Sequence, residues 1–248
     1  MTALPPPPPP PVTETAEGWW FLDEHGERCG PFSSKFDVLY SRSVHFDNLR
    51  LVPGQPPLPP LRQIGSGWWF RNESGGLRGP FEEKYDALRG LEIYLDCVVQ
   101  KKDVLSFSNV RYRFLSNFWQ VKVDFCGLTY PSTEHAFQAA KTLDLVERER
   151  IRCAYSSAEA KQLGKQVRLR ADWEGIKISV MRDFFQQKFY TDPLEQWLLQ
   201  TGDVQLVEGN TWGDAFWGVT HGGTGVGRNE LGKLLMSIRA ELQSEGGT

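Results

Sequence analysis

The stretch Tyr130–Thr142, YPSTEHAFQAAKT, carries the most information about the fold and chemistry of this chain. Ser132 follows a proline and is a good N-cap, so the pattern predicts that a helix begins there. Glu134, Gln138 and Lys141 are four and three residues apart, which places them on one helix face. Because a helix N-terminus favours an ionised carboxylate, we expect a lowered pKa for Glu134 and a role as base or electrostatic stabiliser. The alternative is an exposed Glu that interacts with Lys141.

A second informative stretch is Glu208–Gly218, EGNTWGDAFWG. Trp212 and Trp217 bracket Asp214, Asn210 precedes them, and the glycines let the backbone bend. The two indole rings are either core plugs or a surface on which a planar base stacks. Acid–base groups beside flat aromatic faces suit the cleavage of a bond between a sugar and a base.

The chain has 248 residues, of which 40% are hydrophobic and 24% charged, with a net charge of −3. That balance argues against a polyanion-binding protein by overall charge. The segment Arg148–Arg170 nevertheless holds seven basic and two acidic residues, which predicts either a phosphate-binding face or a solvated helical surface. The glycine-rich run His221–Gly227 leads into the last predicted helix, whose free N–H groups could hold a phosphate.

Cysteine usage and hydropathy favour an intracellular, reducing compartment, and we expect a cytoplasmic protein. The four cysteines, Cys29, Cys97, Cys126 and Cys153, form no C-x-x-C pair and no disulfide framework. With only four scattered histidines, neither a zinc site nor a metal cofactor is expected. No signal peptide or membrane span is evident.

The N-terminal part contains an internal duplication. Gly18–Leu39 and Gly67–Leu88 align without gaps at an offset of 49 residues, and 12 of 22 positions are identical. Each copy is predicted to form two strands joined by a glycine turn, followed by a short helix. We expect a Pro-rich disordered tail at 1–17, repeats at 18–48 and 67–100, a Pro-rich linker at 49–66 and a larger domain at 101–248.

The repeats resemble GYF-like modules through their Trp-Trp-Phe and Gly-Pro-Phe motifs. The resemblance implies an aromatic groove, with Trp19–Trp20 and Trp68–Trp69, that takes a proline-rich peptide. The alternative is that these aromatic residues form the small core of each repeat.

The larger domain is predicted to be α+β and rich in helix, with a small sheet. Strands are expected at 104–107, 121–125 and 204–207. Helices are expected at 132–143, 146–155, 157–163, 172–190, 193–200 and 228–241.

Residues from about 105 to 241 resemble the NADAR family, also called YbiA-like N-glycosidases. The resemblance rests on five motifs in family order: Phe114–Phe118 (FLSNF), Tyr130–Lys141 (YPSTEHAFQAAK), Gly164–Trp173 (GKQVRLRADW), Gly209–Gly218 (GNTWGDAFWG) and Asn229–Met236 (NELGKLLM). It implies hydrolysis of N-glycosidic bonds. The implied substrates are ADP-ribose attached to guanine, in nucleotides or nucleic acid, and phosphoribosylamino-pyrimidines of riboflavin synthesis.

Candidate site residues follow from these motifs and the chemistry above. The catalytic candidates are Glu134, Asp214 and Lys141, with Lys141 either a phosphate or hydroxyl ligand or an amine nucleophile. The substrate-binding candidates are Asn117, Gln138, Arg168, Arg170, Asn210, Trp212, Trp217 and Asn229. A non-catalytic reader of ADP-ribose or nucleotides is the alternative function. Residues 1–100 carry none of these groups, so we expect them to be dispensable for hydrolysis of a small substrate.

Overall fold

The computed structural model describes residues 12–22, 28–32, 61–72, 75–104, 106–107 and 109–245. The chain divides into two compact units, Met1–Pro60 and Leu61–Thr248. The polyproline run, most of the predicted linker and the predicted helix of the first repeat lie outside the described residues.

Each repeat forms a three-stranded antiparallel sheet rather than the predicted two strands. The first contains β1 (Thr13–Thr15), β2 (Gly18–Leu22) and β3 (Arg28–Phe32), and the second contains β4 (Arg62–Ile64), β5 (Gly67–Arg71) and β6 (Leu77–Phe81). In both sheets the strand missed by the sequence pattern comes first and pairs with the Trp-Trp strand in the same register. The pattern missed it because β1 and β4 are three residues long and mostly exposed.

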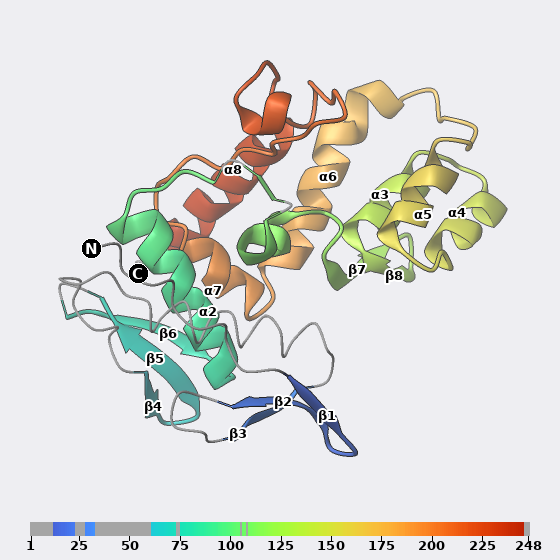
Figure 1. The fold of residues 1–248 in the computed structure, drawn as a ribbon. Coiled ribbons are helices and arrows are strands. Elements are labelled where there is room, and N and C mark those ends of the chain that lie inside the picture. The colour runs from blue at the N-terminus through green and yellow to red at the C-terminus, as the bar shows by residue number, and fades with distance from the viewer. Residues whose placement is uncertain are drawn as a thin grey trace, which may run out of the picture. The chain divides into compact units, whose positions relative to one another are not determined.

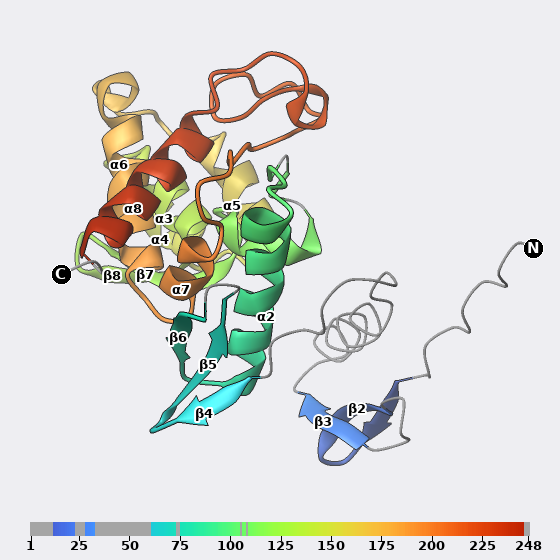
Figure 2. The same ribbon diagram turned by 90° about the vertical axis from the view of Figure 1, so that its left-hand side faces the viewer.

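The second repeat continues into helix α2 (Lys84–Tyr94) and the π-helical turn η1 (Leu95–Val99). As Figure 2 shows, α2 lies along β5 and β6 and reaches α7 (Leu194–Leu199) of the larger domain. The guanidinium carbon of Arg89 lies 4.2 Å from the ring centre of Trp197 and 5.0 Å from that of Trp119. The indole N–H of Trp197 donates to the carbonyl of Asp86 at 2.9 Å.

The η1 turn makes a further buried connection. The Asp96 carboxylate accepts hydrogen bonds from the Arg111 guanidinium and, at 2.9 Å, from the Tyr112 hydroxyl. Arg111 and Tyr112 belong to the 3-10 turn η2 (Val110–Leu115). The second repeat therefore lies in the same compact unit as the larger domain, and no gap in packing occurs at the expected boundary near residue 100.

The larger domain is α+β, as predicted. Its remaining elements are β7 (Gln120–Phe125), β8 (Leu128–Ser132), α3 (Thr133–Ala140), α4 (Leu145–Arg152), α5 (Ser157–Gly164), α6 (Trp173–Phe189), η3 (His221–Gly223) and α8 (Glu230–Glu245). The two-stranded sheet of β7 and β8 packs against α3, α4 and α6 (Figure 1). The strands predicted at 104–107 and 204–207 reduce, among the described residues, to one parallel bridge between Val104 and Leu206.

Helix α3 is enclosed within this domain. All eight of its residues are buried, and it contacts β7, β8, α4, α5 and α6 (Figure 1). Its alanines, Ala136, Ala139 and Ala140, are fully buried and leave room for this close packing. The Ser132 side chain accepts from the backbone N–H of His135, which confirms the predicted N-cap.

Buried polar groups tie the start of α3 to the start of α5. The Ser132 hydroxyl lies 2.7 Å from His135 Nδ1 and 3.0 Å from the Ser157 hydroxyl. The other ring nitrogen of His135 lies 3.2 Å from the Ala154 carbonyl, so it carries the proton. A serine beside a histidine suggests a nucleophile, but both residues are buried and their bonds hold two helix ends together.

None of the described helices has the length and apolar character needed to cross a bilayer.

The packing of α2 and η1 changes the expectation for truncated proteins. A protein of residues 61–248 should fold, whereas one of residues 101–248 should lose about 5 kcal/mol or more of stability. It loses the buried side chains Leu91, Ile93 and Tyr94, each of which contributes roughly 1.5–3 kcal/mol. Chemical denaturation of the two proteins measures the difference, and equal midpoints would show that residues 61–100 are a separate domain.

Candidate functional site

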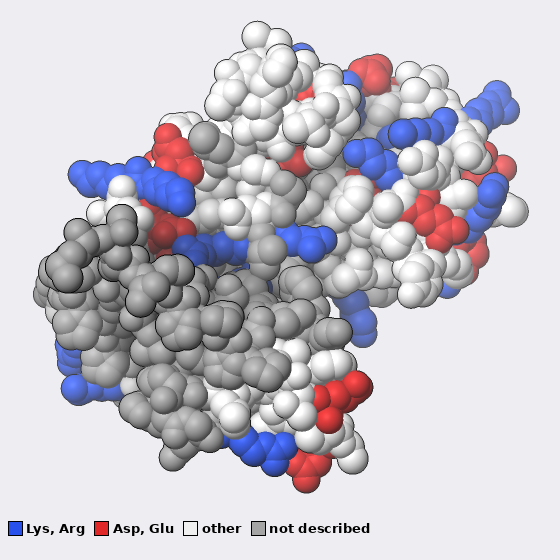
Figure 3. Space-filling model, in the orientation of Figure 1, with Lys and Arg blue, Asp and Glu red and all other residues white. Residues whose placement is uncertain are grey.

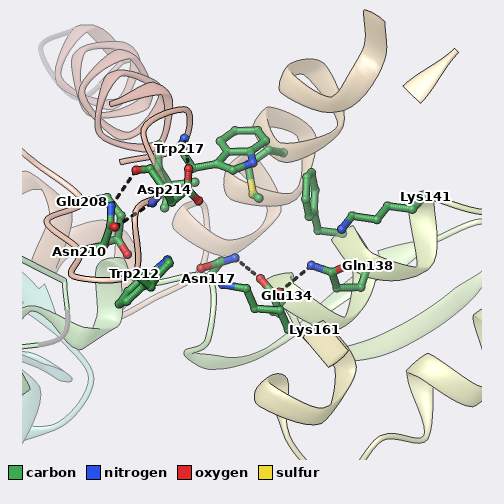
Figure 4. Close-up of a pocket in the computed structure, with 13 residues that line it drawn as sticks. Asn117, Glu134, Gln138, Lys141, Lys161, Glu208, Asn210, Trp212, Asp214 and Trp217 are labelled. Carbon is green, nitrogen blue, oxygen red and sulfur yellow. Dashed lines mark hydrogen bonds between the residues drawn. The ribbon is translucent and has the colours of Figure 1, made fainter. Parts of the chain in front are cut away.

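A pocket of about 210 Å³ opens beside the buried helix α3. Figure 4 shows Glu134, Gln138, Lys141 and Lys161 on one side of it, and Glu208, Asn210, Asp214 and Trp212 on the opposite side. The remaining lining residues are Asn117, Phe137, Met181, Trp217 and Leu231. The pocket therefore joins α3 and α5 to the loop that follows Leu206, more than 40 residues further along the chain.

Eight of the predicted site residues line this pocket. They are Asn117, Glu134, Gln138, Lys141, Asn210, Trp212, Asp214 and Trp217. The two stretches singled out in the sequence are therefore brought together by the fold.

Glu134 is the most constrained of these groups. Its side chain is buried, and each carboxylate oxygen accepts an amide N–H. Gln138 Nε2 donates to Oε1 at 2.7 Å, and Asn117 Nδ2 donates to Oε2. The backbone N–H of Glu134 also donates to the Asn117 carbonyl at 2.9 Å, which fixes the loop before β7 against the helix.

The predicted direction of the Glu134 pKa is wrong. Complete burial raises the pKa of Glu134, because the charged form loses its hydration. Lys161, the Gln138 amide, Lys141 and the Asn117 amide oppose this effect by favouring the carboxylate. The helix N-terminus favours the carboxylate, but enclosure of the whole helix outweighs that effect.

Gln138 is held in place by a close contact with α5. A Cβ atom on Gly164 would lie 2.0 Å from Gln138 Oε1 and 2.7 Å from Gln138 Cβ, so only glycine fits beside this side chain. Gly164 thus lets Gln138 turn its N–H toward Glu134.

Two lysines provide positive charge in the pocket. Burial lowers the pKa of Lys141, with Glu134 opposing the shift. Lys161, on α5, lies over the Trp212 ring at 5.5 Å and over the Phe118 ring at 5.6 Å. Both lysines can meet an anionic group of a ligand.

The loop on the opposite side is shaped by its own side chains. Asn210, 1% exposed, donates to the Asp214 carbonyl at 2.8 Å and accepts from the Asp214 N–H at 3.0 Å. Asp214 Oδ1 in turn accepts the N–H groups of Phe216 and Trp217 at 3.0 and 2.9 Å. These bonds give Asn210 and one oxygen of Asp214 a role in building the loop.

The two tryptophans differ. Trp217 is half-buried and packs edge-on against Phe137, with ring centres 5.4 Å apart. Trp212 is 61% exposed at the pocket, so it is not a core plug. Its free face is available for stacking against a planar group.

Three predicted binding residues lie outside the pocket lining. Arg170 forms a two-pronged bond with Asp172, and Arg168 is exposed with its backbone N–H 3.4 Å from Glu147 Oε1. Asn229 uses its side chain to hold the backbone of Leu206 and Glu208. The glycine-rich run 221–227 also contributes no lining residue.

The sequence reasoning missed two charged lining residues, Lys161 and Glu208. Lys161 stood within the basic segment and Glu208 began the quoted aromatic loop, but neither had a local pattern that singled it out. The basic segment itself is mixed: Figure 3 shows Lys and Arg side chains over α4 and α5 with Asp and Glu side chains among them.

Comparison with known proteins fits this geometry. The NADAR domain matches residues 101–243, which is more than half of the chain. This chain belongs to the NADAR family. The match begins after the N-terminal repeats, and nothing in the comparisons supports the expected likeness of those repeats to GYF modules.

Three relatives illustrate the similarity. N-glycosidase YbiA of Escherichia coli is 44% identical over 139 residues, which cover 54% of this chain and 84% of that protein. A riboflavin biosynthesis protein of Vibrio vulnificus is 42% identical over 133 residues, covering 52% of this chain but 35% of that protein. The NMR structure of E. coli YbiA has 39% sequence identity and a TM-score of 0.49, and covers 57% of this chain and 83% of that chain.

The contact between Gly164 and Gln138 predicts the effect of an added methyl group. Gly164→Ala should lower the free energy of unfolding by about 1–3 kcal/mol, because the new Cβ overlaps the Gln138 side chain. Gly175→Ala in α6 is the matched control, since its Cβ would point into open space. The control should be neutral or gain up to about 1 kcal/mol from reduced backbone freedom. Urea denaturation of both variants tests this, and equal effects would contradict the contact.

Proposed function

We propose that this protein is an N-glycosidase that hydrolyses the bond between a ribose and a base, and that its substrate is ADP-ribose attached to guanine in a nucleotide or nucleic acid. One observation carries the proposal: a buried glutamate with an amide donor on each oxygen lines one pocket with two lysines on its own side and an exposed tryptophan on the opposite side. This arrangement lies within a domain whose relatives include proteins named N-glycosidases.

The reaction passes through a cation-like anomeric carbon. A buried carboxylate that is held in place stabilises such a charge far better than the same group in water. Glu134 fits this role, because its two amide partners favour the ionised form and hold its orientation. The same oxygens can orient the attacking water.

The other lining residues each bind a different part of the substrate. Trp212 offers an open ring face for the base, and Trp217 closes the wall beside Phe137. Lys161 and Lys141 bind the phosphate or ribose hydroxyl groups. The sequence motifs had indicated Arg168 and Arg170 for part of this role. Asp214 supports the loop and is the second candidate for a catalytic carboxylate.

A covalent route through Lys141 remains the alternative mechanism. Burial lowers the pKa of Lys141, which increases the fraction of neutral amine that could attack the anomeric carbon. The amine would displace the base, which takes up the proton that the amine loses, and the glycosylamine formed would open its sugar ring to an imine that water hydrolyses.

A second substrate class is favoured by one observation, the relative named a riboflavin biosynthesis protein. A phosphoribosylamino-pyrimidine presents the same elements, a sugar phosphate and a planar base. Incubation of the protein with this compound and with ADP-ribosylated guanine, scored for free base, decides between them. Binding of ADP-ribose without release of base from either compound would favour the non-catalytic reader.

The repeats are proposed to act as adaptors that bind a proline-rich peptide or deliver the substrate. The proposed location of the protein is the cytoplasm, a reducing compartment. Trp68 of the second repeat is half-buried with the Lys84 amine 5.6 Å from its ring centre, and Trp20 of the first has the Arg28 guanidinium at 4.3 Å. Each repeat thus presents an aromatic ring beside a cation.

Glu134→Gln should lower turnover by at least about 100-fold while ligand still binds. The amide cannot hold a negative charge, and its N–H must face a donor from Asn117 or Gln138. Single-turnover rates with ADP-ribosylated guanine, beside a binding titration, measure both effects. Full activity of the Glu134→Gln variant would show that Glu134 takes no part in catalysis.

Trp212→Ala should weaken substrate binding by roughly 1–3 kcal/mol, the usual contribution of base stacking. Thermal stability should hardly change, since the ring is largely exposed. Trp217→Ala is the comparison and should lower the melting temperature, because its ring packs on Phe137 and Phe216. A large drop in melting temperature for Trp212→Ala would show that its ring is structural.

Lys141→Arg separates the two roles of this lysine. Arg keeps the positive charge but is always protonated, so it can hold a phosphate and cannot act as an amine nucleophile. Retained turnover would exclude the covalent route, and loss of turnover with intact binding would support it. Borohydride trapping of a sugar on the wild-type protein is the independent measurement.

A further inference from the structure

Glu208 is a second carboxylate in the pocket that the proposed mechanism does not use. It lines the pocket opposite Glu134 (Figure 4). Its Oε2 atom is buried, and among the described residues no donor lies within hydrogen-bonding distance of it.

The two glutamates therefore differ in what surrounds them. Burial raises the pKa of both glutamates, so hydrogen bonding is what separates them. Each oxygen of Glu134 accepts an amide N–H, which favours the carboxylate and opposes the effect of burial. Glu208 has a buried oxygen without a donor, and an unpartnered buried oxygen destabilises the charged form far more than the neutral acid. Carboxyl groups that differ in this way are suited to divide the acid and base roles in glycoside hydrolysis.

The position of Glu208 is fixed by its backbone. Asn229 Oδ1 accepts the Glu208 N–H at 3.0 Å, and Asn229 Nδ2 donates to the Leu206 carbonyl at 2.9 Å. The Glu208 carbonyl accepts the Val219 N–H at 2.9 Å. Gly218 permits this approach, since a Cβ there would lie 2.2 Å from the Glu208 carbonyl oxygen.

We propose that Glu208 is the general acid that protonates the leaving base, and that Asn229 is its positioning residue. This inference rests on the proposed N-glycosidase function. The Glu208 proton moves to a nitrogen of the base as the bond between the anomeric carbon and the base breaks, and the electron pair of that bond stays on the base. Water then adds to the anomeric carbon, and the proton that it releases returns to the Glu208 carboxylate. The products are free base and the sugar with a new hydroxyl, and the protein returns to its starting protonation.

The electrostatics of the pocket support this assignment. Burial raises the pKa of Glu208 to about 7, Lys161 opposes the shift, and Asp214 adds to it. The other charged lining groups are Glu134 and Lys141 on α3. A pKa near neutrality is suited to a general acid, which must hold its proton and then release it.

The pH profile of the wild-type protein is the first test. Activity on ADP-ribosylated guanine should fall as pH rises through about 7, because Glu208 loses its proton there. The same substrate methylated on a ring nitrogen has a cationic base that leaves as a neutral molecule without protonation. Its hydrolysis should lack this fall in activity above about pH 7, which is called the basic limb of the pH profile.

Glu208→Gln is the second test. Turnover of ADP-ribosylated guanine should fall at least about 100-fold, the lower range for general acid catalysis, and the basic limb should disappear. Turnover of the methylated substrate should fall less than about 10-fold. Glu174→Gln removes an exposed carboxylate on α6 and is the control for the loss of one charge.

The outcomes distinguish this inference from the function on which it rests. If the wild-type protein releases base from neither ADP-ribosylated guanine nor the pyrimidine, the proposed function fails. If the wild-type protein is active but shows no basic limb, or if Glu208→Gln affects both substrates equally, the assignment of Glu208 alone is overturned. If the variant does not fold, or the methylated substrate is not accepted, the wild-type pH profile on guanine decides.

Asn229 is tested by its nearest analogue. Asn229→Asp keeps an oxygen that can accept the Glu208 N–H, whereas Asn229→Ala keeps none. The Ala variant should lower turnover and shift the pH at which activity falls. The Asp variant should recover part of the turnover and part of the wild-type pH profile. A loss of stability with an unchanged limb would mean that Asn229 is only structural.

Discussion

The enclosure of helix α3 is the constraint on which the larger domain depends. A helix whose residues are all buried cannot send its polar side chains into water, so most of their polar groups bond to partners inside the protein. At its start, Ser132 and His135 bond to each other and to groups at the beginning of α5. Glu134, in the same first turn, bonds to Gln138 one turn further on, and Asn117 completes the partners of the carboxylate. The pocket lies beside this polar face of the buried helix, so the bonds that satisfy the buried groups also arrange the site.

The two sides of the pocket are built by different means. On the α3 side, side chains are positioned by tight packing between helices, as the contact of Gly164 with Gln138 shows. On the opposite side, Asn210 and Asp214 form a network within a loop that has no regular structure. That network leaves the Trp212 ring outside the core. The fixed carboxylate of Glu134 therefore faces the ring of Trp212, whose loop is held by residues close to Trp212 in the sequence.

Local patterns predicted local features well. The N-cap at Ser132, the shared face of Glu134, Gln138 and Lys141, and the helix expected at 172–190 were visible because each depends on spacing along the chain. Features that depend on tertiary contacts were not visible. Burial reversed the expected pKa direction for Glu134, the role of Asn229 required a partner 23 residues earlier, and Lys161 reached the pocket only through the packing of α5 on α3. The strands at 104–107 and 204–207 had strand-like sequences, but the described chain pairs them at one position.

The residues that attach α2 to the larger domain are present in the second copy of the duplication and differ in the first. Arg89, which lies between Trp119 and Trp197, corresponds to Tyr40 in the first copy at the offset of 49 residues. Leu91 and Cys97, both buried, correspond to Arg42 and Asn48. The shared motifs are thus retained in both copies, while the anchoring residues occur in the second alone. Exchanging the two copies would therefore keep the repeat motifs but remove side chains that pack within the same compact unit as the larger domain.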